Sequence, residues 1–327
     1  DDTAVAKFFL GHAGFPVATL TIPAADTGFC NTVTTKGNVV LAGRGLDPVL
    51  RDCLVRAGET IVAFDGLGDK PPAGGGQVLS TRRGLFDSLV DLGRWGSGGA
   101  LDGRVGLVID DSAHDSAGGV AAAYQSLGIN VVATAVVSSD PTSSSVTDGV
   151  RAFAGKGVEA AVLATPVAVQ DRWVAQAQAL APGLRYVVSD AFDAVVNETY
   201  PATFDGALAF TSQRVPWFAR AHGQTPEGTT CLQDWQASVT PPATLSNDEI
   251  VDVLAWCEQA GLARAAQGAP GSFGQAVRGM AVASPLTSDL GALPNGGWGP
   301  RQDAVLTWHS SCACWQEKQP FSDRRAS

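Results

Sequence analysis

The feature of this sequence that most constrains its fold is a regular alternation of short apolar runs and amphipathic segments between Gly103 and Gln213. The apolar runs have the β-branched and aliphatic character of buried strands, and they read RVGLVID, INVVATAVV, AAVLAT, RYVVSD and ALAFTS. The segments between them place apolar residues at helical spacing over 116–127, 146–156 and 168–181. Because strands that alternate with helices form βαβ units, we predict a parallel sheet covered by helices on both faces.

The earlier part of the chain repeats this pattern, which predicts a second α/β lobe. Strand-like runs read VATLTI, NVVLAG and TIVAFD, and helices are expected over 47–57 and 84–94. Asp47 suits the N-cap of the first helix and Pro48 its first position. Gly-rich segments, PPAGGG and GSGG, mark the linker between the lobes. A chain of 327 residues exceeds one ordinary core, and two lobes imply a cleft.

The last third of the chain changes in character after Thr211. Residues 214–245 are rich in Pro, Gly and Thr, and Ser246 with Glu249 then forms a capping box ahead of a long amphipathic helix to about Gln267. The run AVLTWH in the tail is strand-like. We expect it to form a closing hairpin or a crossover.

Composition and motifs exclude several classes of function. The chain is 45% hydrophobic and 17% charged, as in globular proteins, and no run approaches the roughly 18 apolar residues of a membrane span. A net charge of -10 with scattered Lys and Arg argues against nucleic acid as a partner. The sequence has no nucleophile elbow, P-loop, zinc-protease or dinucleotide-binding motif. Four His and many Ser residues leave a catalytic triad open by counting alone, but we expect no enzyme and no cofactor.

The six cysteines fall into three local pairs, which are Cys30 and Cys53, Cys231 and Cys257, and Cys312 and Cys314. Their even number and proximity favour disulfides, and hence an oxidising compartment. Zinc binding by the last pair together with His309 is the alternative, although Cys-x-Cys is not a usual zinc spacing. No signal peptide is visible at the start of the sequence, so we expect a mature or trimmed chain.

Candidate ligand-binding residues follow from one rule: open parallel sheets bind ligands outside the carboxyl ends of their strands. Polar or small residues follow the strands at 43–47, 65–68, 110–114, 165–167 and 189–192. From these segments we select Arg44, Asp47, Asp65, Asp111, His114, Thr165, Ser189 and Asp190. The alternative is structural: Asp47, Asp111 and Asp190 can cap helices, and Arg44 can pair with a nearby carboxylate. The doublet at 110–111 can also bind Mg²⁺.

The order of these segments resembles the type I periplasmic binding proteins of ABC transporters, in particular the branch that binds branched-chain amino acids. The residues that carry the resemblance are RVGLVIDDSAHD, GVEAAVLAT, LRYVVSDAF, FDGALAFTSQR and LPNGGWGPRQDAVLTWHSSCACW. The resemblance implies two Rossmann-like lobes joined by a hinge. Lobe 1 would comprise 1–100 and 214–287, and lobe 2 would comprise 101–213 and 288–327. It also implies a Cys30–Cys53 disulfide in lobe 1.

The function implied by this resemblance is capture of a small polar molecule, such as an amino acid, between the lobes. The protein would be an extracytoplasmic monomer, in the periplasm or at the cell surface, that delivers its ligand to a membrane permease. No metal or cofactor is implied.

Departures from the family pattern point to an altered site. The first strand of lobe 1 is missing from the sequence, and the segment FCNTVTTKG stands where the family has a full helix. Arg44 and Asp47 stand near the family's carboxylate-binding Ser/Thr, and His114 aligns with its ligand-stacking aromatic residue. The alternative function is therefore a sensor or structural envelope protein that keeps the fold and has lost transport.

Overall fold

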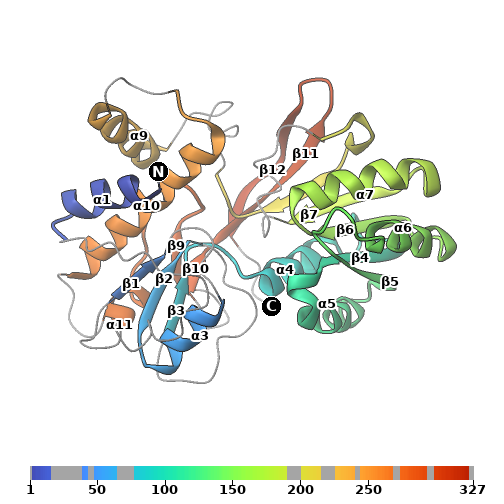
Figure 1. Cartoon of the computed structure of the whole chain (residues 1–327), viewed down its shortest axis with the longest axis horizontal. Helices are drawn as coiled ribbons and strands as arrows, with labels where there is room; N and C mark the ends of the chain where they lie inside the picture. Colours follow the sequence, from blue (N-terminus) through green and yellow to red (C-terminus); the bar gives the residue numbers. More distant parts are fainter. Residues whose placement is uncertain are drawn as a thin grey trace. The chain divides into compact units, whose positions relative to one another are not determined.

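The computed structural model divides the chain into two compact units, and each is described by itself (Figure 1). Unit 1 comprises Asp1–Arg83, Ser212–Gln302 and Asp323–Ser327, and unit 2 comprises Gly84–Thr211 and Asp303–Ser322. The structure describes residues 2–15, 39–42, 48–64, 77–189, 200–214, 225–239, 244–267, 273–292 and 298–323.

Unit 2 is built on a seven-stranded sheet with the strand order β12-β11-β8-β7-β6-β4-β5. The strands are β4 (Arg104–Asp110), β5 (Asn130–Val137), β6 (Ala160–Ala164), β7 (Arg185–Ser189), β8 (Leu208–Thr211), β11 (Gln302–His309) and β12 (Cys314–Asp323). Strands β4 to β8 pair in parallel, whereas β11 pairs antiparallel with β8, with Val305 opposite Phe210. The five predicted strands and their parallel pairing are confirmed, and the AVLTWH run forms β11 of a closing hairpin.

Helices cover both faces of this sheet, as the sequence predicts (Figure 1). Helices α4 (Leu85–Gly96) and α5 (His114–Ser126) pack Leu89, Leu92 and Tyr124 against Leu107 and its neighbours on one face. Helices α6 (Ser145–Gly155) and α7 (Val167–Leu180) belong to the other face. There the Phe153 ring lies directly over the backbone of β4, where a glycine leaves room for it.

Unit 1 contains a parallel sheet of β1 (Val39–Ala42), β2 (Thr60–Ala63) and β3 (Gln77–Ser80). Successive side chains of β2 pack on opposite faces of this sheet. Ile61 packs with helix α3 (Pro48–Arg56), and Val62 packs with α10 (Asn247–Gln267) and α11 (Phe273–Arg278). The short strands β9 (Leu290–Ala292) and β10 (Trp298–Pro300) pair antiparallel. Helix α3 begins at Pro48, as predicted.

Helix α10 anchors two further helices of unit 1, α1 (Asp2–His12) and α9 (Pro226–Ser238). A disulfide joins Cys231 of α9 to Cys257 of α10. The predicted capping box starts α10, because Ser246 N donates to Glu249 Oε2 (2.8 Å) and Glu249 N donates to Ser246 Oγ (3.3 Å). The hydrogen bonds that Glu249 Oε2 accepts from the backbone N and the hydroxyl of Ser246 lower the pKa of the Glu249 carboxyl. Of the described residues ahead of β1, Asp2–His12 form the helix α1.

Two of the other cysteine predictions can be followed in the structure. Cys312 and Cys314 form a disulfide, so the zinc alternative is wrong, because neither sulfur is a free thiolate. Cys53 is also disulfide-bonded, and Cys30 lies outside the described residues.

The unit boundaries differ from the expected ones at two places. The segment 84–100 was expected in lobe 1 but belongs to unit 2, because α4 packs Leu89 and Leu92 into the unit 2 core. The third crossing lies between Gln302 and Asp303 rather than near 287. The predicted strand VATLTI and the segments FCNTVTTKG and PPAGGG lie outside the described residues. None of the helices that the structure describes is both long enough and apolar enough to span a bilayer.

Candidate functional site

The carboxyl edge of the unit 2 sheet is organised by Asp110, the last residue of β4. Its side chain is buried (3% exposed). Oδ1 accepts hydrogen bonds from Ser112 N (3.0 Å) and Ser112 Oγ (2.6 Å), and Oδ2 accepts one from Ser139 Oγ (2.7 Å). Since Ser139 follows β5, the carboxylate ties together the ends of two neighbouring strands. This edge therefore presents ordered hydroxyl and amide groups.

The loop that follows β5 is held by Arg172, which comes from α7. Its guanidinium donates to the carbonyl oxygens of Ser138 (3.1 Å), Ser139 (3.2 Å) and Asp140 (3.1 Å). Asp140 accepts hydrogen bonds from the backbone N and the hydroxyl of Thr142 (both 2.8 Å), which lower the pKa of its carboxyl. The loop is thus built by polar contacts before any ligand arrives.

Two helices begin at this edge: α5 continues a 3-10 turn (Asp111–Ala113) that the Asp110 side chain caps, whereas α7 has no side-chain cap. Helix α5 follows β4 after Ala113, and α7 follows β6 after Pro166. Because β4 and β6 are neighbouring parallel strands, both helix starts lie at the same edge of the sheet. The first N–H groups of a helix have no intrahelical acceptor and carry a partial positive charge, which suits an anion.

Thr165 lies beside the start of α7 and is completely buried. Its Oγ1 has no hydrogen-bond partner among the described residues. Its carbonyl oxygen accepts from Gln170 Nε2 (2.7 Å), and Gln170 Oε1 accepts from the Tyr200 hydroxyl (2.7 Å). A buried hydroxyl without a partner costs stability, so a ligand group that satisfies it gains affinity.

The structure places half of the predicted ligand-binding residues, all of them in unit 2. Thr165 and Ser189 are buried at the ends of the neighbouring strands β6 and β7. Asp111 is exposed in the turn after β4, and His114 begins α5 with 69% of its side chain exposed and Nδ1 3.4 Å from Asp115 Oδ1. The other members of the set lie outside the described residues and remain predictions: Arg44, Asp47, Asp65 and Asp190.

Sequence reasoning missed the groups that build the edge. The capping role considered for Asp111 belongs to Asp110, whose side chain accepts from Ser112 N. The burial of Asp110 could have been predicted, because this residue ends an apolar strand. Ser139 and Arg172 gave no local signal, since their partners are distant in sequence. No cluster of three or more His, Cys, Asp or Glu that could hold a metal ion is found within the described ranges.

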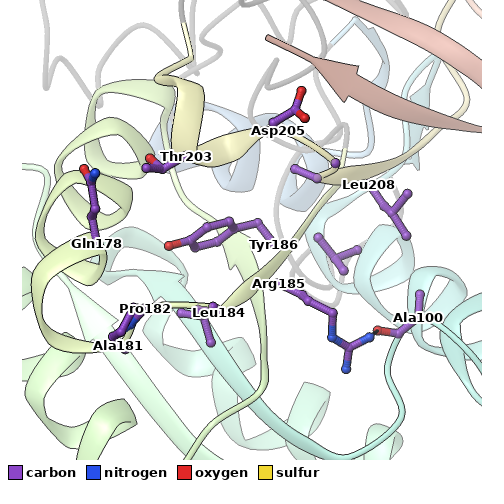
Figure 2. A pocket seen from close by; sticks show the side chains of 14 residues that line it. Ala100, Gln178, Ala181, Pro182, Leu184, Arg185, Tyr186, Thr203, Asp205 and Leu208 are labelled. Atoms are coloured by element: carbon purple, nitrogen blue, oxygen red, sulfur yellow. Dashed lines mark hydrogen bonds between the residues drawn. The ribbon is translucent and has the colours of Figure 1, made fainter.

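A separate hollow of about 470 Å³ lies at the opposite edge of the same sheet, around the start of β7 (Figure 2). Arg185 and Tyr186 line it. The Arg185 guanidinium is held by the carbonyl oxygens of Ala100 (3.1 Å) and Asp102 (2.8 Å). Burial raises the pKa of Tyr186 to about 12. Because this hollow lies at the amino ends of the strands, it is not where a parallel sheet binds its ligand.

Comparisons with known proteins identify the fold. No protein-family model matches the sequence, and no curated protein matches it. A branched-chain amino acid ABC transporter protein from Thermus thermophilus with bound valine has a TM-score of 0.68 at 13% identity, over 98% of this chain and 91% of that one. An R. palustris solute-binding protein in complex with 4-hydroxybenzoate gives 0.68 at 14% identity, over 99% and 93%. A periplasmic binding protein type 1 from Bordetella pertussis gives 0.64 at 12% identity, over 98% and 94%.

The chain has the fold of the type I periplasmic binding proteins. The match spans nearly the whole chain and more than nine-tenths of each of these proteins. The resemblance noted in the sequence is therefore confirmed for the fold. Open parallel sheets bind ligands at the carboxyl ends of their strands, and in unit 2 this is the polar edge described above.

Proposed function

We propose that this chain is an extracytoplasmic solute-binding protein that captures a small organic carboxylate and delivers it to the permease of an ABC transporter. The observation that carries the proposal is the likeness in fold, over almost the full chain, to solute-binding proteins of ABC transporters. The ligands named for those proteins are benzoate, valine and 4-hydroxybenzoate. All three carry a carboxylate.

The chemistry of the unit 2 edge supports an anionic group on the ligand. The uncapped start of α7 offers N–H donors, and the buried Thr165 hydroxyl offers one more. Asp110 and Asp111 place negative charge at the same edge, which suits a ligand ammonium. An amino acid or a related zwitterion has both groups, so we favour that class over a simple benzoate.

We propose that the whole predicted set takes part, with one group of residues from each unit. Arg44, Asp47 and Asp65 would contribute from the first, and Asp111, His114, Thr165, Ser189 and Asp190 from the second. His114 can stack on a solute and donate a hydrogen bond, and its exposed ring is free to do so. No catalytic step, cofactor or nucleic acid enters the proposal, and the protein acts as a monomer.

The first experiment is a thermal-shift panel of amino acids, benzoates and other small carboxylates. A ligand at 100 times its Kd adds about 2.7 kcal/mol to the free energy of unfolding, which a melting curve detects. Stabilisation by a carboxylate, and none by its amide, is the expected result. No shift with any compound would favour the sensor or structural alternative, and turnover of a stabilising compound would favour an enzyme.

The second experiment tests the site with a matched pair of variants. Thr165→Val removes the unpartnered buried hydroxyl at nearly constant volume, and Thr134→Val makes the same change at an exposed position of β5. We expect Thr165→Val to weaken binding about 10- to 100-fold without lowering stability, because no hydrogen bond among the described residues is lost. Thr134→Val should leave affinity unchanged. Equal affinities for both variants, measured by calorimetry, would remove Thr165 from the site.

Transport is tested in cells. Deleting the gene should abolish uptake of the ligand that the panel identifies. Normal uptake in the deletion strain, with binding retained by the purified protein, would point to a sensor.

A further inference from the structure

The tip of the β11–β12 hairpin carries a disulfide between Cys312 and Cys314, closed over a single intervening residue. The hairpin tip is open to solvent: Cys312 and Ala313 are exposed, and Cys314 is half-buried. A thiol in solution can therefore reach the Cys312 sulfur. The Cys231–Cys257 disulfide differs in both respects, since it joins two helices across 26 residues and Cys231 is only 5% exposed.

The residue between the two cysteines is held in an unfavourable backbone conformation. Ala313 has φ of 47°, and it is the one non-glycine residue with positive φ in the described part of the chain. A left-handed backbone conformation is unfavourable for a non-glycine residue, because its Cβ comes too close to the following carbonyl oxygen. Ala313 lies inside the short disulfide ring and at the end of the hairpin turn, and we expect opening of the ring to let it leave this conformation. Reduction of this disulfide is favoured accordingly.

A hydrogen-bond donor stands ready for the thiolate that reduction releases. Gln316 Nε2 lies 3.8 Å from Cys312 Sγ and 3.9 Å from Cys314 Sγ, within reach of both sulfurs. Thiolates are strong acceptors compared with disulfide sulfurs, so this contact strengthens as the S–S bond breaks. The amide thus stabilises the leaving group whichever sulfur is attacked.

We propose that Cys312–Cys314 is a thiol–disulfide exchange site that accepts electrons from low-molecular-weight thiols. A thiolate RS⁻ attacks Cys312 Sγ, the S–S bond breaks, and Cys314 leaves as a thiolate that takes a proton from water. A second RS⁻ then attacks the sulfur of the R group in the mixed disulfide, which releases RSSR and the Cys312 thiolate, and this thiolate is also protonated. In sum, the disulfide and two RSH give the dithiol and RSSR. This activity does not depend on the proposed transport function.

The experiment equilibrates the whole folded protein in glutathione redox buffers of graded potential. Acid quenching, alkylation and peptide mapping then give the reduced fraction of each cysteine pair. We expect Cys312–Cys314 to be half-reduced at a ratio of reductant to oxidant at least about tenfold lower than Cys231–Cys257, which corresponds to about 30 mV. Equal midpoints, or reduction of the hairpin pair only when the protein unfolds, would overturn the proposal.

Two variants with matched controls test the roles of Ala313 and Gln316 in the proposed exchange. Ala313→Gly removes the strain, so it should make the pair harder to reduce by up to about tenfold, or about 30 mV, whereas Ala202→Gly, at an exposed turn, should not. Gln316→Leu should slow exchange severalfold, whereas Gln125→Leu, on the exposed surface of α5, should leave the rate unchanged. The proposal is contradicted if Ala313→Gly leaves the redox midpoint of Cys312–Cys314 unchanged and Gln316→Leu leaves the exchange rate unchanged. Neither neighbouring residue would then influence the disulfide. Urea unfolding of each oxidised variant checks that its fold is intact.

Discussion

A buried carboxyl in unit 1 gives the most direct test of the structure. Glu258 of α10 is 4% exposed, and the Ser284 hydroxyl donates a hydrogen bond to its Oε2. The hydroxyl groups of Ser284, Thr81 and Thr287 lower the pKa of this carboxyl. Burial outweighs these hydrogen bonds and raises the pKa of Glu258 from 4.5 to about 7. Because burial disfavours the charged form, the folded protein holds this carboxyl protonated up to near-neutral pH.

The free-energy cost follows from this shift. The rise from 4.5 to about 7 amounts to roughly 3 kcal/mol, at about 1.4 kcal/mol per pKa unit. Below pH 4.5 the carboxyl is neutral in both states and costs nothing. As the pH rises from 4.5 to 7, the unfolded chain loses the proton while the folded protein keeps it, so stability falls. Above pH 7 both states are ionised and the loss is complete.

Glu258→Gln keeps the shape and removes the titration. Urea unfolding of wild type and variant between pH 4 and 8 should show a difference in free energy of unfolding that moves by about 3 kcal/mol in favour of the variant as the pH rises from 4.5 to 7. Glu249→Gln is the control, because its exposed, hydrogen-bonded carboxylate has a lowered pKa and its contribution is lost on acidification instead. Parallel curves for wild type and Glu258→Gln would refute the reasoning.

Further predictions concern unit 2. Gly106→Ala should lower the free energy of unfolding by about 1–3 kcal/mol, since its Cβ would lie 2.2 Å from the Phe153 ring. Gly118→Ala, on an open face of α5, should raise it by about 0.5–1 kcal/mol, and effects of the same sign in urea unfolding would count against the packing described. Arg172→Met should cost about 1–3 kcal/mol and speed amide hydrogen exchange in the loop after β5, and unchanged exchange would deny that Arg172 holds the loop. His114→Ala should weaken ligand binding by about 1–3 kcal/mol in calorimetry and leave the melting temperature unchanged, because its side chain is 69% exposed, whereas a lowered melting temperature with unchanged affinity would make His114 structural.

Much of the fold could be predicted from local sequence patterns. Strands β4 to β8 were predictable because each is a short apolar segment bounded by polar residues. The capping box of Ser246 and Glu249 predicted the start of α10. The boundary between the units was misplaced because Gly-rich composition marks turns, whereas the place of α4 depends on which core receives Leu89 and Leu92. That choice is made by tertiary packing.

The site was predictable only at the level of the sheet edge. The sequence could place Thr165 and Ser189 at the carboxyl edge of the sheet, because Thr165 follows β6 and Ser189 ends β7, and their part in ligand binding stays a prediction. The bond between Asp110 and Ser139 could not be found, since it depends on β4 lying beside β5 in the sheet. Arg172 likewise reaches a loop more than thirty residues earlier in the chain.

The antiparallel strand β11 also bears on how the protein is made. Strand β8 ends at Thr211, and its second neighbour in the sheet is β11, which begins at Gln302. A ribosome must therefore synthesise the whole second segment of unit 1 before β8 gains this neighbour. Until then β8 is an open edge containing Leu208 and Phe210. Unpaired apolar edges invite aggregation. A nascent chain that lacks β11 therefore exposes an aggregation-prone edge, which a chaperone would protect. The sheet of unit 2 is covered at β8 only when the last tenth of the sequence has been synthesised.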